Sequence, residues 1–166
     1  MSKVRVGLVG TGFVARIHMA AYTHLKAKAE VVGVTSGKLE NARAFARQWG
    51  IPKCFSSYEE MLNDPDIDLI DICTPTYLHG RMIIQAANAR KHVACEKPLT
   101  GYFGPSDAAA RGPDRIGESV SRAEMLREVL RELDAIEKAL RDNGVRFLYG
   151  ENFVYAPGVE KFRRLL

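Results

Sequence analysis

The stretch "VGLVGTGFVARIH", from Val6 to His18, decides the fold that the rest of the chain must share. It places Gly10, Gly12 and Ala15 in the spacing G-x-G-x-x-A, directly after a short β-branched run. The first glycine permits a tight turn, the second lets the backbone approach a pyrophosphate, and the small third residue allows helix and strand to pack closely. The helix that follows offers unpaired N–H groups to phosphate. In preference to a purely structural turn, we predict a dinucleotide site formed by Gly10, Thr11, Gly12, Phe13 and Val14.

On either side of this stretch, runs that predict strands alternate with amphipathic stretches that predict helices. Such alternation requires crossover connections, and therefore a parallel sheet with helices on both faces. We predict the α/β class, with a Rossmann-like, doubly wound, mostly parallel six-stranded sheet. The strands are expected at Val4–Val9, Val31–Thr35, Lys53–Phe55, Leu69–Cys73, His92–Cys95 and Val145–Tyr149. Four helices are expected at Phe13–Leu25, at Leu39–Trp49, at Thr76–Ala89 and from Pro157 onward. Two more are expected after capping boxes: a short one after Ser57 and Glu60, and a longer one after Ser121 and Glu124, whose apolar face runs from Leu126 to Leu140.

The composition fits a globular domain and excludes several classes of protein. The chain has 166 residues, of which 46% are hydrophobic and 27% charged, which is enough for one compact domain. Its net charge of +4 suits an anionic ligand but is too small and scattered for a nucleic-acid-binding protein. No apolar run approaches the roughly 20 residues that cross a membrane, and no signal pattern precedes the first strand, so we expect a cytoplasmic protein. The three cysteines lack CxxC spacing and are expected to be reduced thiols, with no metal site.

The end of the second predicted strand bears on the choice between NAD and NADP. NAD-selective sites usually carry an acidic residue about 20 positions after the glycines, where it bonds the ribose 2′-hydroxyl. Here Thr35 and Ser36 occupy that place, and Lys38 follows. A small hydroxyl beside a cation suits a 2′-phosphate, so these residues favour NADP. The alternative is a turn at Ser36 and a solvated helix start at Lys38, in a site that accepts NAD.

Polar residues also follow the later predicted strands. Ligands of open parallel sheets bind beyond the carboxyl ends of the strands, so these residues are expected to converge on one edge. They are Thr74, Pro75 and His79 after the fourth strand, Glu96, Lys97 and Pro98 after the fifth, and Asn152 and Tyr155 after the sixth.

Lys97 is the candidate catalytic residue among them. A cation beside a reacting hydroxyl stabilises developing alkoxide charge, and a desolvated lysine can relay the proton. The alternative for Lys97 is a surface ion pair with Glu96. The alternatives for His79 and for Asn152 are a solvent-facing helix start and a strand-end turn. His18, inside the first predicted helix, is expected to be a packing or surface histidine.

Together these motifs resemble the glucose–fructose oxidoreductase/inositol dehydrogenase (Gfo/Idh/MocA) family of NAD(P)-dependent oxidoreductases. The resemblance rests on G-x-G-x-x-A with "ARIH", on "CTPTYLH" and above all on "EKPLT", and it covers most of residues 3–166. It implies hydride transfer between a nicotinamide and a sugar, polyol or related hydroxyl compound. It further implies that Lys97 is the catalytic lysine, that the following Pro98 is cis, that Glu96 and His79 line the nicotinamide side, and that Thr74-Pro75 lies at the ribose.

The resemblance also bears on domain organisation. Members of the family carry a second domain that supplies most substrate contacts. We therefore expect residues 1–156 to form the NAD(P)-binding domain and residues 157–166 to begin a helix leading to a missing substrate domain, so that this chain alone is inactive. A homo-oligomer is compatible with the exposed end. The Gly/Pro-rich segment 100–120 is expected to be an inserted loop, and a candidate flap. The alternative function is a non-catalytic module that binds and senses NAD(P) and acts through a protein partner.

Overall fold

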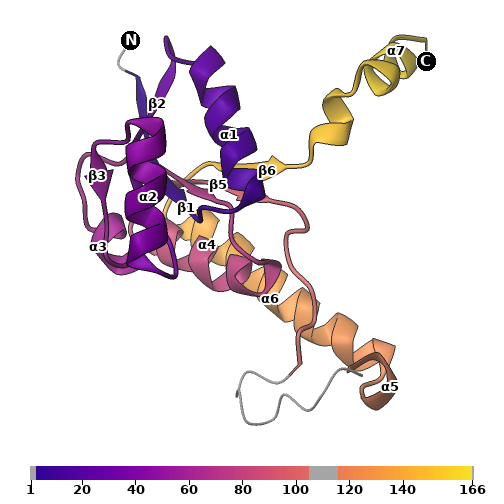
Figure 1. Ribbon diagram of the computed structural model, residues 1–166. Coiled ribbons are helices and arrows are strands. Elements are labelled where there is room, and N and C mark those ends of the chain that lie inside the picture. The colour runs from indigo at the N-terminus through magenta and orange to yellow at the C-terminus, as the bar shows by residue number, and fades with distance from the viewer. Residues whose placement is uncertain (1–2, 105–115, 166) are drawn as a thin grey trace.

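The computed structural model describes residues 3–104 and 116–165 and contains one sheet of six strands (Figure 1). The strands are β1 (Val4–Val9), β2 (Ala29–Thr35), β3 (Lys53–Cys54), β4 (Leu69–Ile72), β5 (His92–Glu96) and β6 (Phe147–Gly150). They lie in the order β3-β2-β1-β4-β5-β6, and every pairing among them is parallel. The predicted α/β, Rossmann-like sheet is confirmed. Its strand order reverses between β1 and β4, and ligands of such sheets bind in the crevice at that point.

Helices cover both faces of this sheet, as predicted. One core, which includes Ala15 and Phe45, packs α1 and α2 against β1 and β2, and another, which includes Ile83 and Ile136, packs α4 and α6 on the opposite face. Figure 1 shows α1 on one side of the sheet and α4 with α6 on the other. The helices are α1 (Phe13–His24), α2 (Leu39–Trp49), α3 (Tyr58–Leu62), η1 (Thr76–Leu78), α4 (His79–Asn88), α5 (Ile116–Ser119), α6 (Arg122–Asp142), η3 (Asn152–Tyr155) and α7 (Pro157–Leu165). Across the described residues, no helix combines the length and the apolar character that a membrane crossing needs.

The ends of the short helices follow local signals. Gly50 closes α2 with φ 69°, a left-handed conformation that glycine adopts at little cost. Ser57 caps α3 by accepting a hydrogen bond from the backbone N–H of Glu60 at 3.0 Å. The Glu60 carboxylate turns back to the start of the helix, where it accepts from the backbone N–H and the hydroxyl of Ser56. These bonds, together with the backbone N–H of Ser57, lower the pKa of Glu60.

The long helix α6 departs from the expected amphipathic pattern. Its N-cap is the predicted one, because the Ser121 hydroxyl accepts from the backbone N–H of Glu124. Ile136 is 3% exposed, but Leu126 and Leu130 remain 57% and 49% exposed. Figure 1 shows the reason, since the first turns of α6 extend beyond the sheet and α4. Helical periodicity identified an apolar face but not how far along the helix that face is covered.

The predicted loop from Thr100 to Val120 contains the short helix α5, so the expectation of a loop is wrong for Ile116–Ser119. Near its start, the ring of Phe103 contacts Tyr77 edge-on, with ring centroids 6.2 Å apart. The central part of the candidate flap, residues 105–115, lies outside the described residues.

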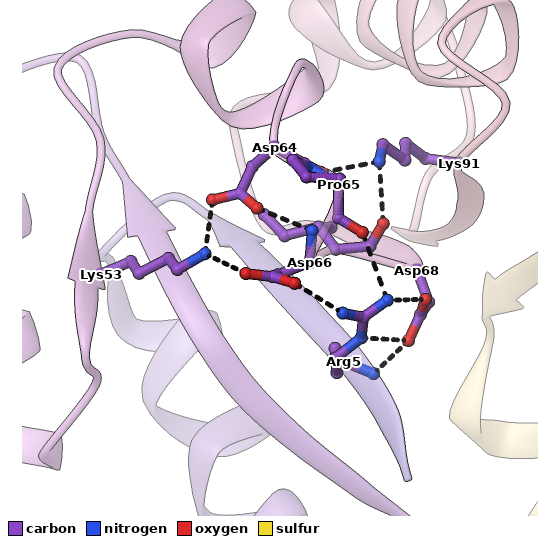
Figure 2. A network of polar contacts seen from close by, with 8 residues as sticks. Arg5, Lys53, Asp64, Pro65, Asp66, Asp68 and Lys91 are labelled. Atoms are coloured by element: carbon purple, nitrogen blue, oxygen red, sulfur yellow. Dashed lines mark hydrogen bonds and ion pairs between the residues drawn. The ribbon is translucent and has the colours of Figure 1, made fainter. Parts of the chain in front are cut away.

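A network of charged groups joins the amino ends of the strands, on the edge opposite the predicted cleft (Figure 2). The guanidinium of Arg5 in β1 donates to both carboxylate oxygens of Asp68, at 3.0 and 2.8 Å, and to Asp66 at 2.9 Å. Lys53 in β3 donates to Asp64 and Asp66, each at 2.8 Å. The network therefore ties β1 and β3 to the segment that leads into β4, and it holds the sheet from the side away from the cleft.

This network should make the protein sensitive to acid. The hydrogen bond from Arg5 lowers the pKa of Asp68 below its usual 3.8, and the hydrogen bond from Lys53 lowers that of Asp64. A carboxyl group whose pKa is lower in the folded state stabilises the fold above its unfolded pKa, and that contribution is lost as the pH falls through the folded value. We expect the free energy of unfolding in urea to fall between about pH 5 and about pH 3, and less steeply in Arg5→Met. Lys3→Met, which removes an exposed ion pair with Glu30, is the control. If it changes the pH dependence of the free energy of unfolding as much as Arg5→Met does, the prediction is contradicted.

Candidate cofactor site

A cavity of about 590 Å³ opens at the carboxyl ends of β1, β2 and β4. The turn after β1 lines it, as do the residues that follow β2 and β4, so three of the predicted polar segments meet there. A fourth segment, between β3 and α3, was not predicted, because Ser56 and Ser57 are read from the sequence only as turn and cap residues. The lining includes Gly10, Thr11, Gly12, Thr35, Ser36, Gly37, Ser56, Ser57, Tyr58, Thr74, Pro75 and Met82.

The two motif glycines are required for different structural reasons. Gly10 has φ 106°, and a Cβ atom there would lie 2.5 Å from the carbonyl oxygen of Cys73. Gly12 has φ −77°, and a Cβ atom there would meet nothing within 4 Å. Gly10 is therefore required by the fold, while the space beside Gly12 is open to a ligand. Gly12 is also the N-cap of α1 and supplies no side-chain bond to it, which leaves the N–H groups at the start of the helix available to a phosphate.

The residues predicted to contact the ribose lie close to this turn. The Ser36 hydroxyl at the end of β2 lies 3.2 Å from the hydroxyl of Thr11, so both face the same end of the cavity. Lys38 is exposed and precedes α2, and it is not among the residues that line the cavity. Phe13 and Val14 lie in the first turn of α1, with Phe13 77% exposed. The structure thus brings Thr11 and Ser36 together and leaves Lys38 at the margin.

His79 is 1% exposed and does not face the cavity with its ring. Its Nδ1 lies 2.9 Å from the carbonyl oxygen of Pro98, and its Nε2 lies 2.9 Å from that of Thr74. The solvent-facing alternative for His79 is wrong. The ring instead connects the loop after β4, which lines the cavity, to the loop after β5, which carries Lys97.

Lys97 itself is exposed, directly after the end of β5. The Lys97–Pro98 peptide bond is cis, as the family resemblance implies. Within residues 3–104 and 116–165, the Lys97 ammonium has no ion pair, so the alternative of a surface pair with Glu96 is wrong. The Glu96 carboxylate points to the α1 side of the sheet, where it lies 3.1 Å from Nε2 of His18.

Behind this turn lies a partly buried cluster that the sequence did not predict. Nδ1 of His18 lies 2.9 Å from the carboxylate of Asp71, which is 0% exposed, and the Tyr22 hydroxyl donates to the same oxygen at 2.9 Å. His18 is therefore neither a surface residue nor simple packing. Burial by itself would lower the pKa of His18, but the hydrogen bonds and charges of Asp71 and then Glu96 outweigh burial and raise it to about 9. Burial, then the charge of Asp71, raises the pKa of the Cys73 thiol well above its usual range.

His18, Asp71 and Cys73 also place one potential ligand atom each within 4.8 Å of one another. Hydrogen bonds account for these short distances, including 3.4 Å between the Cys73 sulfur and Nδ1 of His18. These side chains therefore form a hydrogen-bonded cluster.

The residues after β6 lie apart from the cavity. Asn152 is exposed in η3, and Tyr155 is 74% exposed. The Glu151 carboxylate accepts from the backbone N–H of Phe153 at 3.0 Å and caps this short helix. The geometry is that of a strand-end turn, and neither Asn152 nor Tyr155 lines the cavity.

Residues 4–110, which build β1 to β5 and the cavity, match the profile of an oxidoreductase family with an NAD-binding Rossmann fold, Gfo/Idh/MocA. The chain belongs to this family. Similar proteins include an uncharacterized oxidoreductase of Rhizobium meliloti, which is 38% identical over 76% of this chain and 38% of its own length. A levoglucosan dehydrogenase of Pseudarthrobacter phenanthrenivorans is 38% identical over 60% of this chain and 27% of its own length.

A solved structure extends this Gfo/Idh/MocA match to the whole fold. A levoglucosan dehydrogenase in complex with NADH and levoglucosan superposes with a TM-score of 0.73 and 28% identity, over 99% of this chain and 40% of that one. The present chain therefore spans well under half the length of these relatives. What it shares with them is the NAD-binding part.

Proposed function

We propose that this chain binds a nicotinamide dinucleotide in the cavity at the ends of β1, β2 and β4. The protein that contains it then transfers a hydride between that cofactor and a hydroxyl group of a sugar, polyol or related compound. The observation that supports this most directly is the bridge made by His79, whose two hydrogen bonds hold the cavity loop at Thr74 beside the Lys97 loop. A cofactor seated on the glycine turn would thereby lie near Lys97, which has no ion pair within the described residues.

The residues present fit the cofactor. The open space at Gly12 and the start of α1 suit a pyrophosphate, while Thr11, Ser36 and Thr74-Pro75 suit the sugar hydroxyls. When bound, the nicotinamide supplies the hydride acceptor or donor. Lys97 would stabilise the developing alkoxide charge of the substrate and relay its proton. A levoglucosan dehydrogenase in complex with NADH and levoglucosan is among the structural relatives, which supports this class of substrate.

The domain boundary near residue 156 is part of the same proposal. None of the residues of α7 is buried, and Phe162 and Leu165 are 61% and 76% exposed. Figure 1 shows α7 projecting away from the sheet. This helix fits a connection to a further domain that would supply substrate contacts, and it contributes nothing to the cofactor cavity.

The cofactor proposal is tested by measuring the affinities for NADH and NADPH through the fluorescence of the reduced nicotinamide. We expect both to bind, with NADPH at least as tight as NADH, because the described residues that line the cavity around Ser36 carry no carboxylate and Lys38 follows directly after this lining. Lys38→Ala should weaken NADPH by about two- to fivefold, the range for one exposed ion pair, and leave NADH unchanged.

Lys28→Ala is the matched control, because Lys28 is an exposed lysine at the other end of β2. If neither nucleotide binds, the cofactor proposal fails. If Lys38→Ala and Lys28→Ala leave the same ratio of NADPH to NADH affinity, the preference for NADP fails and binding alone is retained.

A further inference from the structure

His18 lies between two carboxylates that belong to neighbouring strands. Its ring contacts Asp71 of β4 at 2.9 Å and Glu96 of β5 at 3.1 Å. Ionised carboxylates only accept hydrogen bonds, so a ring that satisfies both of them donates from both nitrogens, as an imidazolium does. The Tyr22 hydroxyl and the Cys73 thiol also belong to the cluster, and each donates a hydrogen bond to the Asp71 carboxylate. The charges therefore alternate along the cluster: Asp71 is negative, His18 is positive and Glu96 is negative. Glu96 directly precedes Lys97.

Two contacts hold the Glu96 side chain: its Oε1 lies 3.1 Å from Nε2 of His18, and its Oε2 accepts from the backbone N–H of Lys97 at 3.3 Å. Successive residues at the end of a strand point to opposite faces, and the Glu96 carboxylate is 16% exposed on the α1 face while Lys97 is exposed. Glu96 is also the acid nearest to Lys97 in the sequence. If its carboxylate were free to turn outward, it would be the natural partner for the Lys97 ammonium.

We propose that His18 is a positioning residue for Lys97: by holding the Glu96 carboxylate on the α1 face of the sheet, it keeps that carboxylate from pairing with the Lys97 ammonium at the rim of the cofactor cleft. The inference rests on the proposed function for the chemical use of that ammonium. The position of the ammonium can be tested without turnover. Asp71 anchors the arrangement, since a fully buried carboxylate holds its partners firmly.

The test measures how fast acetic anhydride acylates Lys97 at pH 8, by peptide mass spectrometry, relative to the exposed Lys26. In His18→Gln, Glu96 is released and pairs with Lys97, so acylation of Lys97 should slow by about two- to fivefold, the range for an exposed ion pair. His24→Gln is the matched control, because His24 is an exposed histidine on the same helix. The double variant His18→Gln/Glu96→Gln removes the new partner and should restore the original rate.

An acylation rate in His18→Gln equal to that in His24→Gln would overturn the inference, as would a slow rate that the double variant does not restore. Failure of NADH to bind would reject the proposed function and leave these rates unaffected, so the two failures are distinguishable. If His18→Gln does not fold, Glu96→Gln serves instead. Its His18 ring, followed by NMR, should titrate at a lower pH than in the unaltered protein, because the hydrogen bond and charge of Glu96 help to raise the pKa of His18; an unmoved midpoint would show that His18 does not hold Glu96.

Discussion

Gly10→Ala should destabilise the protein by about 3–5 kcal/mol, a large part of the stability of a domain of this size. Two effects add. The residue has φ 106°, which costs an L-residue roughly 1–2 kcal/mol, and its new Cβ would stand 2.5 Å from the carbonyl oxygen of Cys73. That oxygen belongs to the backbone just after the central strand β4, so it cannot move aside cheaply. A urea titration of the variant should show the loss as a lower midpoint.

Gly12→Ala is the contrasting variant. Its backbone has φ −77° and its Cβ would meet nothing within 4 Å, so the free energy of unfolding should change by less than about 1 kcal/mol. Its affinity for NADH should nevertheless fall at least about tenfold, because the methyl group occupies the space through which the backbone approaches the pyrophosphate. A destabilised Gly12→Ala, or one that binds NADH normally, would contradict the separate roles of the two glycines.

This difference between the glycines shows what the sequence could predict. The spacing of the motif and the alternation of strands and helices identify the sheet, its parallel order and the edge that holds the cavity, because both signals are local. The sequence also indicates that Gly10 and Gly12 are needed. It does not show why Gly10 is needed: the carbonyl group of Cys73 leaves no room for a Cβ atom, and that carbonyl comes near only because β1 packs beside β4.

The cluster around His18 shows more clearly what the sequence alone cannot predict. His18 is 53 residues from Asp71 and 78 from Glu96 in the sequence, so nothing local indicates that they meet. His79 was likewise assigned to the cleft by its place after β4, whereas its ring is buried between two backbone carbonyl groups. A residue's position at a strand end can be predicted, but the direction of its side chain depends on the neighbouring strands and helices.

Lys97→Met should have the second large effect, this time on turnover. On the proposed function, in an assay with NAD(P) and the best substrate from a panel of sugars and polyols, kcat should fall by about 10²–10⁴-fold, the usual contribution of a positioned proton donor or acceptor. Lys97 is exposed and unpaired within the described part of the chain, and it does not line the cavity. Affinity for NADH should therefore stay within about twofold, and stability should stay within the range of surface substitutions. Lys26→Met, an exposed lysine after α1, is the control for loss of one charge.

Lys97→Arg distinguishes the two parts of the proposed role. Arginine keeps a positive charge that can stabilise an alkoxide, but its pKa above 12 prevents it from relaying a proton near neutral pH. If the charge alone matters, Lys97→Arg should retain most of the activity that Lys97→Met loses. If proton relay matters, both variants should be equally slow at pH 7, and the arginine variant should recover as the pH rises and hydroxide removes the proton from the substrate. Full activity in Lys97→Met would exclude both, and the rim of the cleft after β5 would then serve only to hold the cofactor loop through His79.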